Sequence, residues 1–234
     1  MAPGRDALVD EQIAYYDARA GEYDRMLMRE RRYDLDGLDP ASPDRDTREL
    51  EIVEARLNEI APFGDVLEIA CGTGWWTKRL AKLARSVTAI DASPEMLRIL
   101  RRRVRAASVH DVRADVFDWT PDRAYDLVFF GFWISHVPQD RFEEFWTVVR
   151  ASLSPGGRVF FVDEMKWDGV EGHEEALGDD RGTTMRHLED GRKFRMVKVY
   201  HRPPELQLRL VALGWSAKVR AAGDRIYSGI AEAG

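Results

Sequence analysis

The stretch VLEIACGTGWWT, residues 66–77, indicates how the surrounding chain folds. Its first residues fit a β-strand, two glycines then flank Thr73, and two tryptophans begin a predicted helix. A Gly-x-Gly turn between a strand and a helix is typical of an open α/β sheet, where ligands bind beyond the carboxyl ends of the strands. Gly72 and Gly74 lack a Cβ atom, so the backbone can approach a ligand closely. The alternative is a tight turn that binds nothing.

The chain after this turn alternates between strand and helix patterns. Predicted strands lie at 65–70, 86–91, 109–116, 124–133 and 156–164, and predicted helices lie between them at 75–84, 94–105 and 139–153. Ser93 is expected to cap the helix that begins at Pro94. Strands joined by helical crossovers form a mostly parallel sheet. Two more strands flank residues 222–224 as a predicted hairpin, which adds an antiparallel strand.

Composition limits the classes of function. The 234 residues are 44% hydrophobic and 32% charged, which predicts a folded, soluble protein. The formal net charge of −6 gives no overall attraction to nucleic acids or anionic membranes. Cys71 is the single cysteine, so an internal disulfide is impossible and a reducing compartment fits. No apolar run suits a signal peptide or a membrane span, and we expect a cytoplasmic, bacterial protein without nucleic-acid or membrane partners.

Two acidic residues follow the next two strands. Asp91 lies 17 residues after Gly74, where a carboxylate can accept both hydroxyls of a ribose. Asp115 follows the third strand, from which a side chain can reach an adenine amino group, although a helix-cap role is the alternative. A dinucleotide fingerprint would need a third glycine where Thr77 stands, and the neighbouring indoles suit a ligand without phosphates. The pattern therefore favours a nucleoside without a pyrophosphate.

With these motifs in order, the chain resembles the class I S-adenosylmethionine-dependent methyltransferases. The stretches that carry the resemblance are VLEIACGTG, VTAIDASPEML, RADVFDW, YDLVFFGFWISHVP and LSPGGRVFFVDE. The chain departs from the family's first motif at Trp76, where the pattern has a glycine. The resemblance covers residues 10 to 165 well, and it specifies the cofactor far better than the substrate.

The resemblance implies an α/β fold: a Rossmann-like, seven-stranded, mostly parallel sheet with an antiparallel C-terminal hairpin strand, helices on both faces and an N-terminal helical lid. We expect one domain over 1–234, with the lid at 1–45, the cofactor-binding core at 46–164, a polar insertion at 165–193, and C-terminal strands and a helix at 194–234. This stretch is rich in Gly, Asp and Glu, has little periodicity and is interpreted as a long insertion.

The resemblance also implies the site. S-adenosylmethionine is the expected cofactor and S-adenosylhomocysteine the product. The expected cofactor-binding residues are Tyr16, Tyr23, Glu68, Ala70, Gly72, Thr73, Asp91, Ala92, Met96, Asp115, Val116, Phe117, Gly131 and Phe132. The expected substrate-binding residues are Tyr15, Trp133, His136, Met165 and Trp167. For any single tyrosine, packing against the core is an equal alternative.

Methyl transfer to a neutral amine or phenol requires a proton to leave, and a general base can assist. His136 follows the fourth strand on the cofactor side, so it is the candidate base or substrate contact; a structural role in the loop is the alternative. No carboxylates stand at 131–134 to bind Mg²⁺, and we expect no metal. The expected reaction is methylation of oxygen, nitrogen or carbon in a small, apolar or aromatic molecule.

Three other functions remain open at this point. A protein of the same fold can bind S-adenosylmethionine without transferring its methyl group, or can methylate a macromolecule. A dinucleotide oxidoreductase is the third. The run RILRRRVR, residues 98–105, can bind phosphates, but a solvated helix face is the favoured interpretation.

Overall fold

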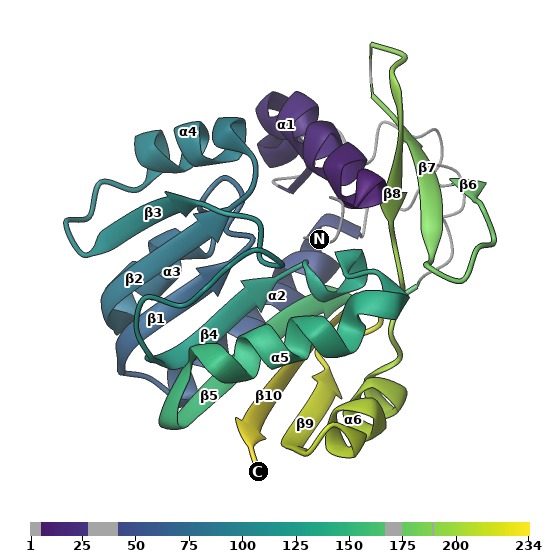
Figure 1. The fold of residues 1–234 in the computed structure, drawn as a ribbon. Coiled ribbons are helices and arrows are strands. Elements are labelled where there is room, and N and C mark those ends of the chain that lie inside the picture. Colours follow the sequence, from purple (N-terminus) through teal and green to yellow (C-terminus); the bar gives the residue numbers. More distant parts are fainter. Residues whose placement is uncertain (1–5, 28–41, 167–174, 189) are drawn as a thin grey trace, which may run out of the picture.

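The computed structural model describes residues 6–27, 42–166, 175–188 and 190–234, and it centres on a seven-stranded sheet (Figure 1). The strands are β1 Phe63–Ile69, β2 Ala84–Asp91, β3 Val109–Arg113, β4 Tyr125–Gly131, β5 Leu153–Glu164, β9 Trp215–Ala221 and β10 Ile226–Ala233. Their order is β3-β2-β1-β4-β5-β10-β9. The first five run parallel, and β10 is antiparallel to both β5 and β9. The predicted parallel sheet with an antiparallel C-terminal hairpin is confirmed.

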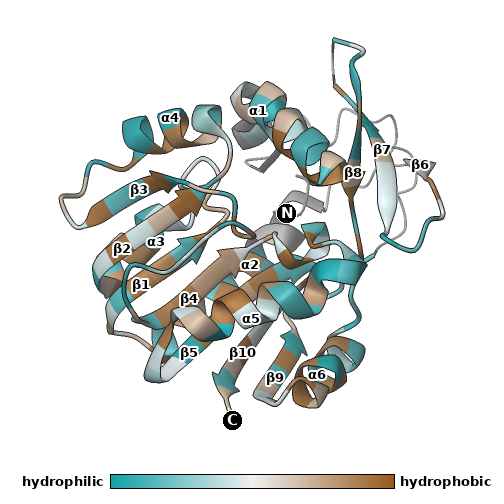
Figure 2. Cartoon of the chain, in the orientation of Figure 1, coloured by the Kyte–Doolittle hydropathy of each residue, from teal (hydrophilic) through white to brown (hydrophobic). Residues whose placement is uncertain are grey.

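Helices cover both faces of this sheet. Successive residues of a strand point to opposite faces, so a strand buried on both sides is apolar throughout. In β4, Val128 and Phe130 pack with α5 (Phe142–Ser152) and α6 (Pro203–Ala212). Leu127 and Phe129 point the other way, toward α2 (Ser42–Glu59), α3 (Thr77–Leu83) and α4 (Pro94–Arg103). The hydropathy colouring in Figure 2 follows this arrangement, with apolar residues concentrated in the central strands.

Several predicted boundaries are borne out and two differ. The Ser93 side chain accepts a hydrogen bond from the Met96 amide at 3.1 Å, so the predicted cap of α4 is confirmed. The strand predicted over 109–116 ends at Arg113, because Asp115 folds into a turn by accepting from the Phe117 amide. The helix α2 begins at Ser42, which lies within the segment expected to belong to the lid.

The described part of the insertion expected at 165–193 contains two strands that the sequence does not predict, and a third strand beside them falls where C-terminal strands are expected. Strands β6 (Glu175–Ala176), β7 (Thr183–His187) and β8 (Lys193–Val197) form a separate antiparallel sheet. The helix α1 (Ala7–Leu27) lies between β8 and α4, above the carboxyl ends of the main strands (Figure 1). Leu188, Phe194 and Met196 of this region pack against Tyr15 of α1, so the helix covers the apolar side of the small sheet.

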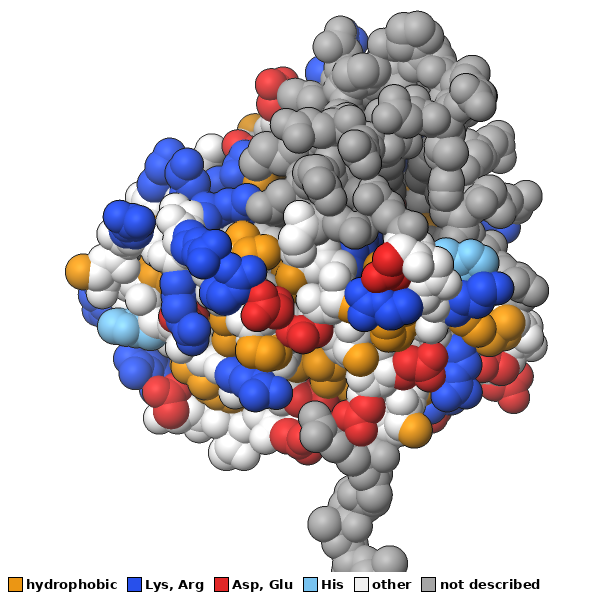
Figure 3. Space-filling view, turned by 90° about the horizontal axis from the view of Figure 1, so that it is seen from above, with side chains coloured by type: hydrophobic (Ala, Val, Ile, Leu, Met, Phe, Trp, Pro, Cys, Tyr) orange, Lys and Arg blue, Asp and Glu red, His pale blue; other side chains and the backbone are white. Residues whose placement is uncertain are grey.

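The arginine run on α4 is exposed on the outer side of the molecule, and Figure 3 shows Lys and Arg side chains gathered there. Arg98 pairs with Glu95 at 2.6 Å, and Arg101 pairs with Asp111 at 2.6 Å. These pairs fit the favoured interpretation of a solvated face. None of the helices in the described ranges is both long and apolar enough to span a bilayer.

Candidate active site

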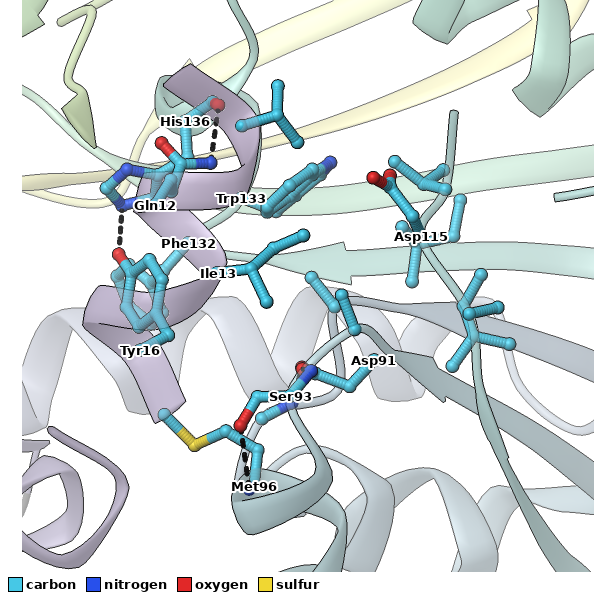
Figure 4. Close-up of a pocket in the computed structure, with 18 of the residues that line it drawn as sticks. Gln12, Ile13, Tyr16, Asp91, Ser93, Met96, Asp115, Phe132, Trp133 and His136 are labelled. Atoms are coloured by element: carbon cyan, nitrogen blue, oxygen red, sulfur yellow. Dashed lines mark hydrogen bonds between the residues drawn. The ribbon is translucent and has the colours of Figure 1, made fainter. Parts of the chain in front are cut away.

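A cavity lies where the strand order reverses, between β1 and β4 at their carboxyl ends (Figure 4). Strand ends diverge at such a switch point, which leaves a crevice between the following loops. Ala70 and Phe132 directly follow β1 and β4, and their φ angles are +52° and +56°. Such left-handed backbone is strained for residues other than glycine and is concentrated at functional sites. Both residues line the cavity.

The two glycines of the first turn have different roles. Gly72, at φ +54°, lines the cavity, and a Cβ atom there would meet its nearest neighbour only at 4.0 Å. Gly74, at φ +82°, faces away: a Cβ atom there would lie 2.9 Å from Cγ of Leu100 on α4. Gly74 therefore allows the turn to pack against α4 and does not form the ligand surface.

Asp91 is held by backbone amides on both sides. Its Oδ2 accepts from the Gly72 amide at 2.8 Å, and its Oδ1 accepts from the Ser93 amide at 2.8 Å. Each carboxylate oxygen keeps a second lone pair, which is available to a ligand hydroxyl. Burial raises the pKa of Asp91 to about 6, against the opposing effect of the two amides. The carboxyl is thus ionised at neutral pH but close to its titration range.

The far end of the cavity is formed by residues after β2 and β3. Ala92, Met96, Asp115 and Val116 line it. Asp115 Oδ1 accepts from the Phe117 amide at 3.0 Å, which fixes the carboxylate at the rim. Phe117 itself does not line the cavity; its ring instead lies 3.6 Å from the Arg141 guanidinium carbon.

The wall after β4 contains Gly131, Phe132 and Trp133. A Cβ atom on Gly131 would lie 2.6 Å from Cδ1 of Trp76, whose indole is buried against Phe129. Trp76 stands where the family's first motif has a glycine. The lack of a side chain at Gly131 makes room for this indole.

The helix α1 supplies the remaining wall. Tyr16 and Tyr23, both expected from the sequence, line the cavity together with Val9, Gln12 and Ile13, which were not predicted. These five residues share one face of α1, because their positions follow the i, i+3, i+4, i+7 spacing of a helix face, with Tyr23 two turns after Tyr16. The same periodicity was present in the sequence, but it does not tell which surface such a helix covers.

His136 lies on the short 3₁₀ turn Ile134–His136 and lines the cavity (Figure 4). Its Nδ1 is 2.7 Å from the Val197 carbonyl, which can only accept, so Nδ1 carries the proton. Burial, followed by the charges of Lys198 and Arg186, holds the pKa of His136 well below its usual value. The ring is therefore neutral at pH 7, and its Nε2 lone pair accepts from the Tyr16 hydroxyl at 2.9 Å.

A buried polar network fixes the turn that carries His136. Asp163, at the end of β5, accepts from the amide and the hydroxyl of Ser135, each at 2.9 Å. Lys198 Nζ donates to Ser135 Oγ at 2.9 Å and pairs with Glu164 at 2.6 Å. Buried charges of this kind are tolerated only when paired and hydrogen-bonded. These hydrogen bonds to Ser135 therefore restrain the backbone of the turn that carries His136.

Several predicted site residues lie away from the cavity. Tyr15 is buried with Leu188 and Met196, between α1 and the small sheet. Thr73 is buried and accepts from Arg103 at 2.8 Å, and Met165 packs against the main core. The buried Glu68 also does not line the cavity, and burial raises its pKa to about 8. Trp167 lies outside the described residues.

Comparison with known proteins agrees with this geometry. Residues 66–157 match a family model described as "Methyltransferase domain". The fold superimposes on DhpI, solved as a complex with SAH, with a TM-score of 0.77, 40% sequence identity and coverage of 97% of each chain. The chain belongs to the class I S-adenosylmethionine-dependent methyltransferases.

Two curated relatives match about half of the chain. A demethylmenaquinone methyltransferase of Listeria welshimeri is 31% identical over 118 residues, which are 46% of this chain and 48% of the relative. A fatty-acid O-methyltransferase of Mycolicibacterium smegmatis is 32% identical over 117 residues, 49% of this chain and 42% of the relative. This methyltransferase thus matches less than half the length of either relative. In its described part, no group of three or more His, Cys, Asp or Glu residues is arranged to hold a metal ion.

Proposed function

We propose that the protein binds S-adenosylmethionine in this cavity and transfers its methyl group to a small molecule. The observation that carries the proposal is the set of contacts around Asp91: both oxygens are oriented by backbone amides and keep lone pairs for two ribose hydroxyls. The cavity is lined mainly by apolar side chains with a few polar groups among them, which is typical of small-molecule sites. Asp115 and Met96 would bound the adenine, and Gly72 and Gly131 the methionine portion.

The likeness to DhpI supports the cofactor, since DhpI is seen in complexes with SAH and with SAM. When bound, S-adenosylmethionine supplies an electrophilic methyl group on a positively charged sulfur. The chain then has three tasks: to enclose the reacting atoms, to align the acceptor and to receive any proton that leaves it. The α1 wall supports enclosure, and Trp133 and His136 are placed to contact an acceptor.

The surroundings of His136 support an acceptor that carries an acidic group as well as an apolar part. Two cationic side chains, Lys198 and Arg186, lie near enough to lower the pKa of His136 by their charge. Trp133, Phe132 and Ile13 offer apolar surface nearby. Among the small, apolar or aromatic molecules expected from the sequence, we therefore favour those that also carry a carboxylic acid or a similar anion. The fatty-acid relative is consistent with this class.

A screen for S-adenosylhomocysteine release tests both parts. Purified protein and S-adenosylmethionine are incubated with matched sets of aliphatic and aromatic carboxylic acids, phenols, alcohols and amines, and product is counted by mass spectrometry. We expect turnover with acids and much less with amines of equal size. Binding of S-adenosylmethionine without turnover on any acceptor would favour the alternative of a non-methylating or macromolecule-directed protein, and preference for NADH in a binding comparison would refute the proposal.

Two further aspects of the proposal follow from composition and charge. We place the protein in the cytoplasm, which the single, buried Cys71 supports. We also propose that it has no nucleic-acid partner, because Arg98 and Arg101 of the arginine run are already engaged by carboxylates.

A further inference from the structure

Asp17 of α1 contacts the segment that carries Asp91, although it does not itself line the cavity. Its Oδ1 accepts from the Ser93 hydroxyl at 2.8 Å and from the Glu95 amide at 3.2 Å. Both donors belong to the first turn of α4 or its cap. An acidic group at this end of a helix is stabilised by the free amides and by the helix dipole. A residue of one helix therefore caps another helix across the mouth of the site.

Ser93 connects Asp17 to the proposed ribose carboxylate in one step. Its hydroxyl donates to Asp17, and the same oxygen accepts from the Met96 amide at 3.1 Å. Its own amide donates to Asp91 Oδ1 at 2.8 Å. The path from α1 to Asp91 thus consists of two hydrogen bonds with defined donors and acceptors. Any displacement of α1 from α4 breaks the first of them and removes a restraint on the second.

Gln12 and Glu11 hold α1 on the side away from α4. Gln12 donates to the His136 carbonyl at 3.1 Å and accepts from the Val197 amide at 2.9 Å. Glu11 accepts from the amide of Arg195 at 2.7 Å and pairs with its guanidinium. These bonds join α1 to the 3₁₀ turn and to the small sheet. Asp17 joins it instead to the loop that follows β2, so the two groups of contacts can be separated by mutation.

The enclosure of the cavity makes this contact relevant to the cofactor. Tyr16 and Tyr23 flank Asp17 on α1 and line the wall opposite β1 and β4. Because these two side chains cover one side of the cavity, the seating of α1 affects the enclosure of a bound ligand. The charge of Asp17 also raises the pKa of Asp91, although less than burial does, which shows that the two carboxylates are electrostatically coupled.

We propose that Asp17 is a positioning residue for the cofactor: it fixes α1 against the start of α4 and, through Ser93, holds Asp91 in the orientation that binds the ribose. This inference rests on the proposed binding of S-adenosylmethionine. Because Asp17 contacts Ser93 only when α1 is seated, it contributes to the retention of the cofactor more than to its initial encounter. Its loss therefore increases the dissociation rate with little change in the association rate.

The test compares Asp17→Ala and Asp17→Asn with Glu11→Ala, a matched control that removes a carboxylate from the same helix but from its other side. Binding of S-adenosylhomocysteine is measured by calorimetry, and its dissociation by stopped-flow displacement. We expect Asp17→Ala to raise Kd about tenfold through faster dissociation, which is the size of one charge-assisted hydrogen bond. Asp17→Asn keeps the Oδ1 acceptor and should recover part of the affinity. Glu11→Ala should change Kd less than about twofold.

Hydrogen exchange supplies a readout that does not depend on the ligand. Exchange of the Glu95 amide in the free protein should become faster in Asp17→Ala and stay unchanged in Glu11→Ala. Equal weakening of binding by Asp17→Ala and Glu11→Ala would overturn the proposal, because it would reduce Asp17 to general anchoring of α1. Wild-type affinity in Asp17→Ala would overturn it as well. Failure of the wild type to bind S-adenosylhomocysteine would instead refute the proposed function, on which this inference rests.

Discussion

The Tyr16 hydroxyl lies 2.9 Å from Nε2 of His136, and the Val197 carbonyl on the other side of the ring decides the direction of that bond. Since Nδ1 carries the proton, Nε2 can only accept, and Tyr16 is the donor. Within this pair, the Tyr16 oxygen is therefore the atom that can accept a hydrogen bond from a ligand in the cavity. A proton that leaves an acceptor can be taken up by the Tyr16 oxygen while Tyr16 gives its hydroxyl proton to Nε2 of His136.

The base hypothesis for His136 predicts a specific pattern of losses. We expect His136→Ala and Tyr16→Phe each to lower kcat by about 10²-fold, the lower end of general-base contributions. The Kd for S-adenosylhomocysteine should stay within about threefold for His136→Ala. Because burial keeps the pKa of His136 well below 6.5, kcat should show no inflection near that value. Full turnover in His136→Ala with normal cofactor binding would leave the histidine a structural role only.

Cofactor affinity should depend on the ionisation of Asp91. Only the carboxylate can accept from two ribose hydroxyls while it accepts from two amides, and burial raises its pKa to about 6. Affinity should therefore be constant above pH 7 and fall about tenfold for each pH unit below 6. Calorimetry at pH 5, 6 and 7.5 measures this slope. Asp91→Asn should bind about 10²-fold more weakly with little dependence on pH, and an equal slope in this variant would assign the titration to another group.

The stability of the fold should respond to Glu68 with the opposite dependence on pH. Burial raises the pKa of Glu68 to about 8 from a model-compound value of 4.5, and its Oε2 has no hydrogen-bond partner among the described residues. The native protein therefore holds a proton there that the unfolded chain releases above pH 4.5. The contribution of this protonated carboxyl to the free energy of unfolding is fully present below pH 4.5 and is lost as the pH rises through 8.

We thus expect the free energy of unfolding of Glu68→Gln, relative to that of the wild type, to rise by about 2 kcal/mol between pH 5 and pH 9. This is less than the full pKa shift implies, because the surroundings of a buried charge rearrange to solvate it. Urea unfolding at the two pH values measures the difference. A stability gap between the two proteins that does not change with pH would contradict a raised pKa at this residue.

The contact between Gly131 and Trp76 predicts a steric pair. In Gly131→Ala the new methyl group would lie 2.6 Å from the indole, and the indole has no flexible end that can give way. We expect a loss of about 1–3 kcal/mol in the free energy of unfolding, together with weaker cofactor binding, because Gly131 lines the cavity. Adding Trp76→Phe should recover part of the loss in the double variant. Additive effects of the two substitutions, measured by chemical denaturation, would show that they do not share this space.

The fold was predictable because its signals are local. The apolar runs around Val66 and Leu127, the turn at Gly72 and the cap at Ser93 each depend on residues within a few positions. Strand β8 falls where C-terminal strands are expected, whereas the sequence does not predict β6 and β7, because both are short and pair within a small sheet of their own. A segment of that kind has no periodicity that distinguishes it from a loop.

The sequence by itself determined the order of strands and helices, the turn at Gly72 and the acidic residues placed after β2 and β3, since backbone propensity and strand burial act over neighbouring residues. The tertiary structure decided which residues meet. The proton position on His136 depends on Val197 and Tyr16, which are 61 and 120 residues away, and the Asp17–Ser93 contact joins residues 76 apart. Such contacts come from the packing of whole elements, which buries their polar groups and so requires each donor to find an acceptor.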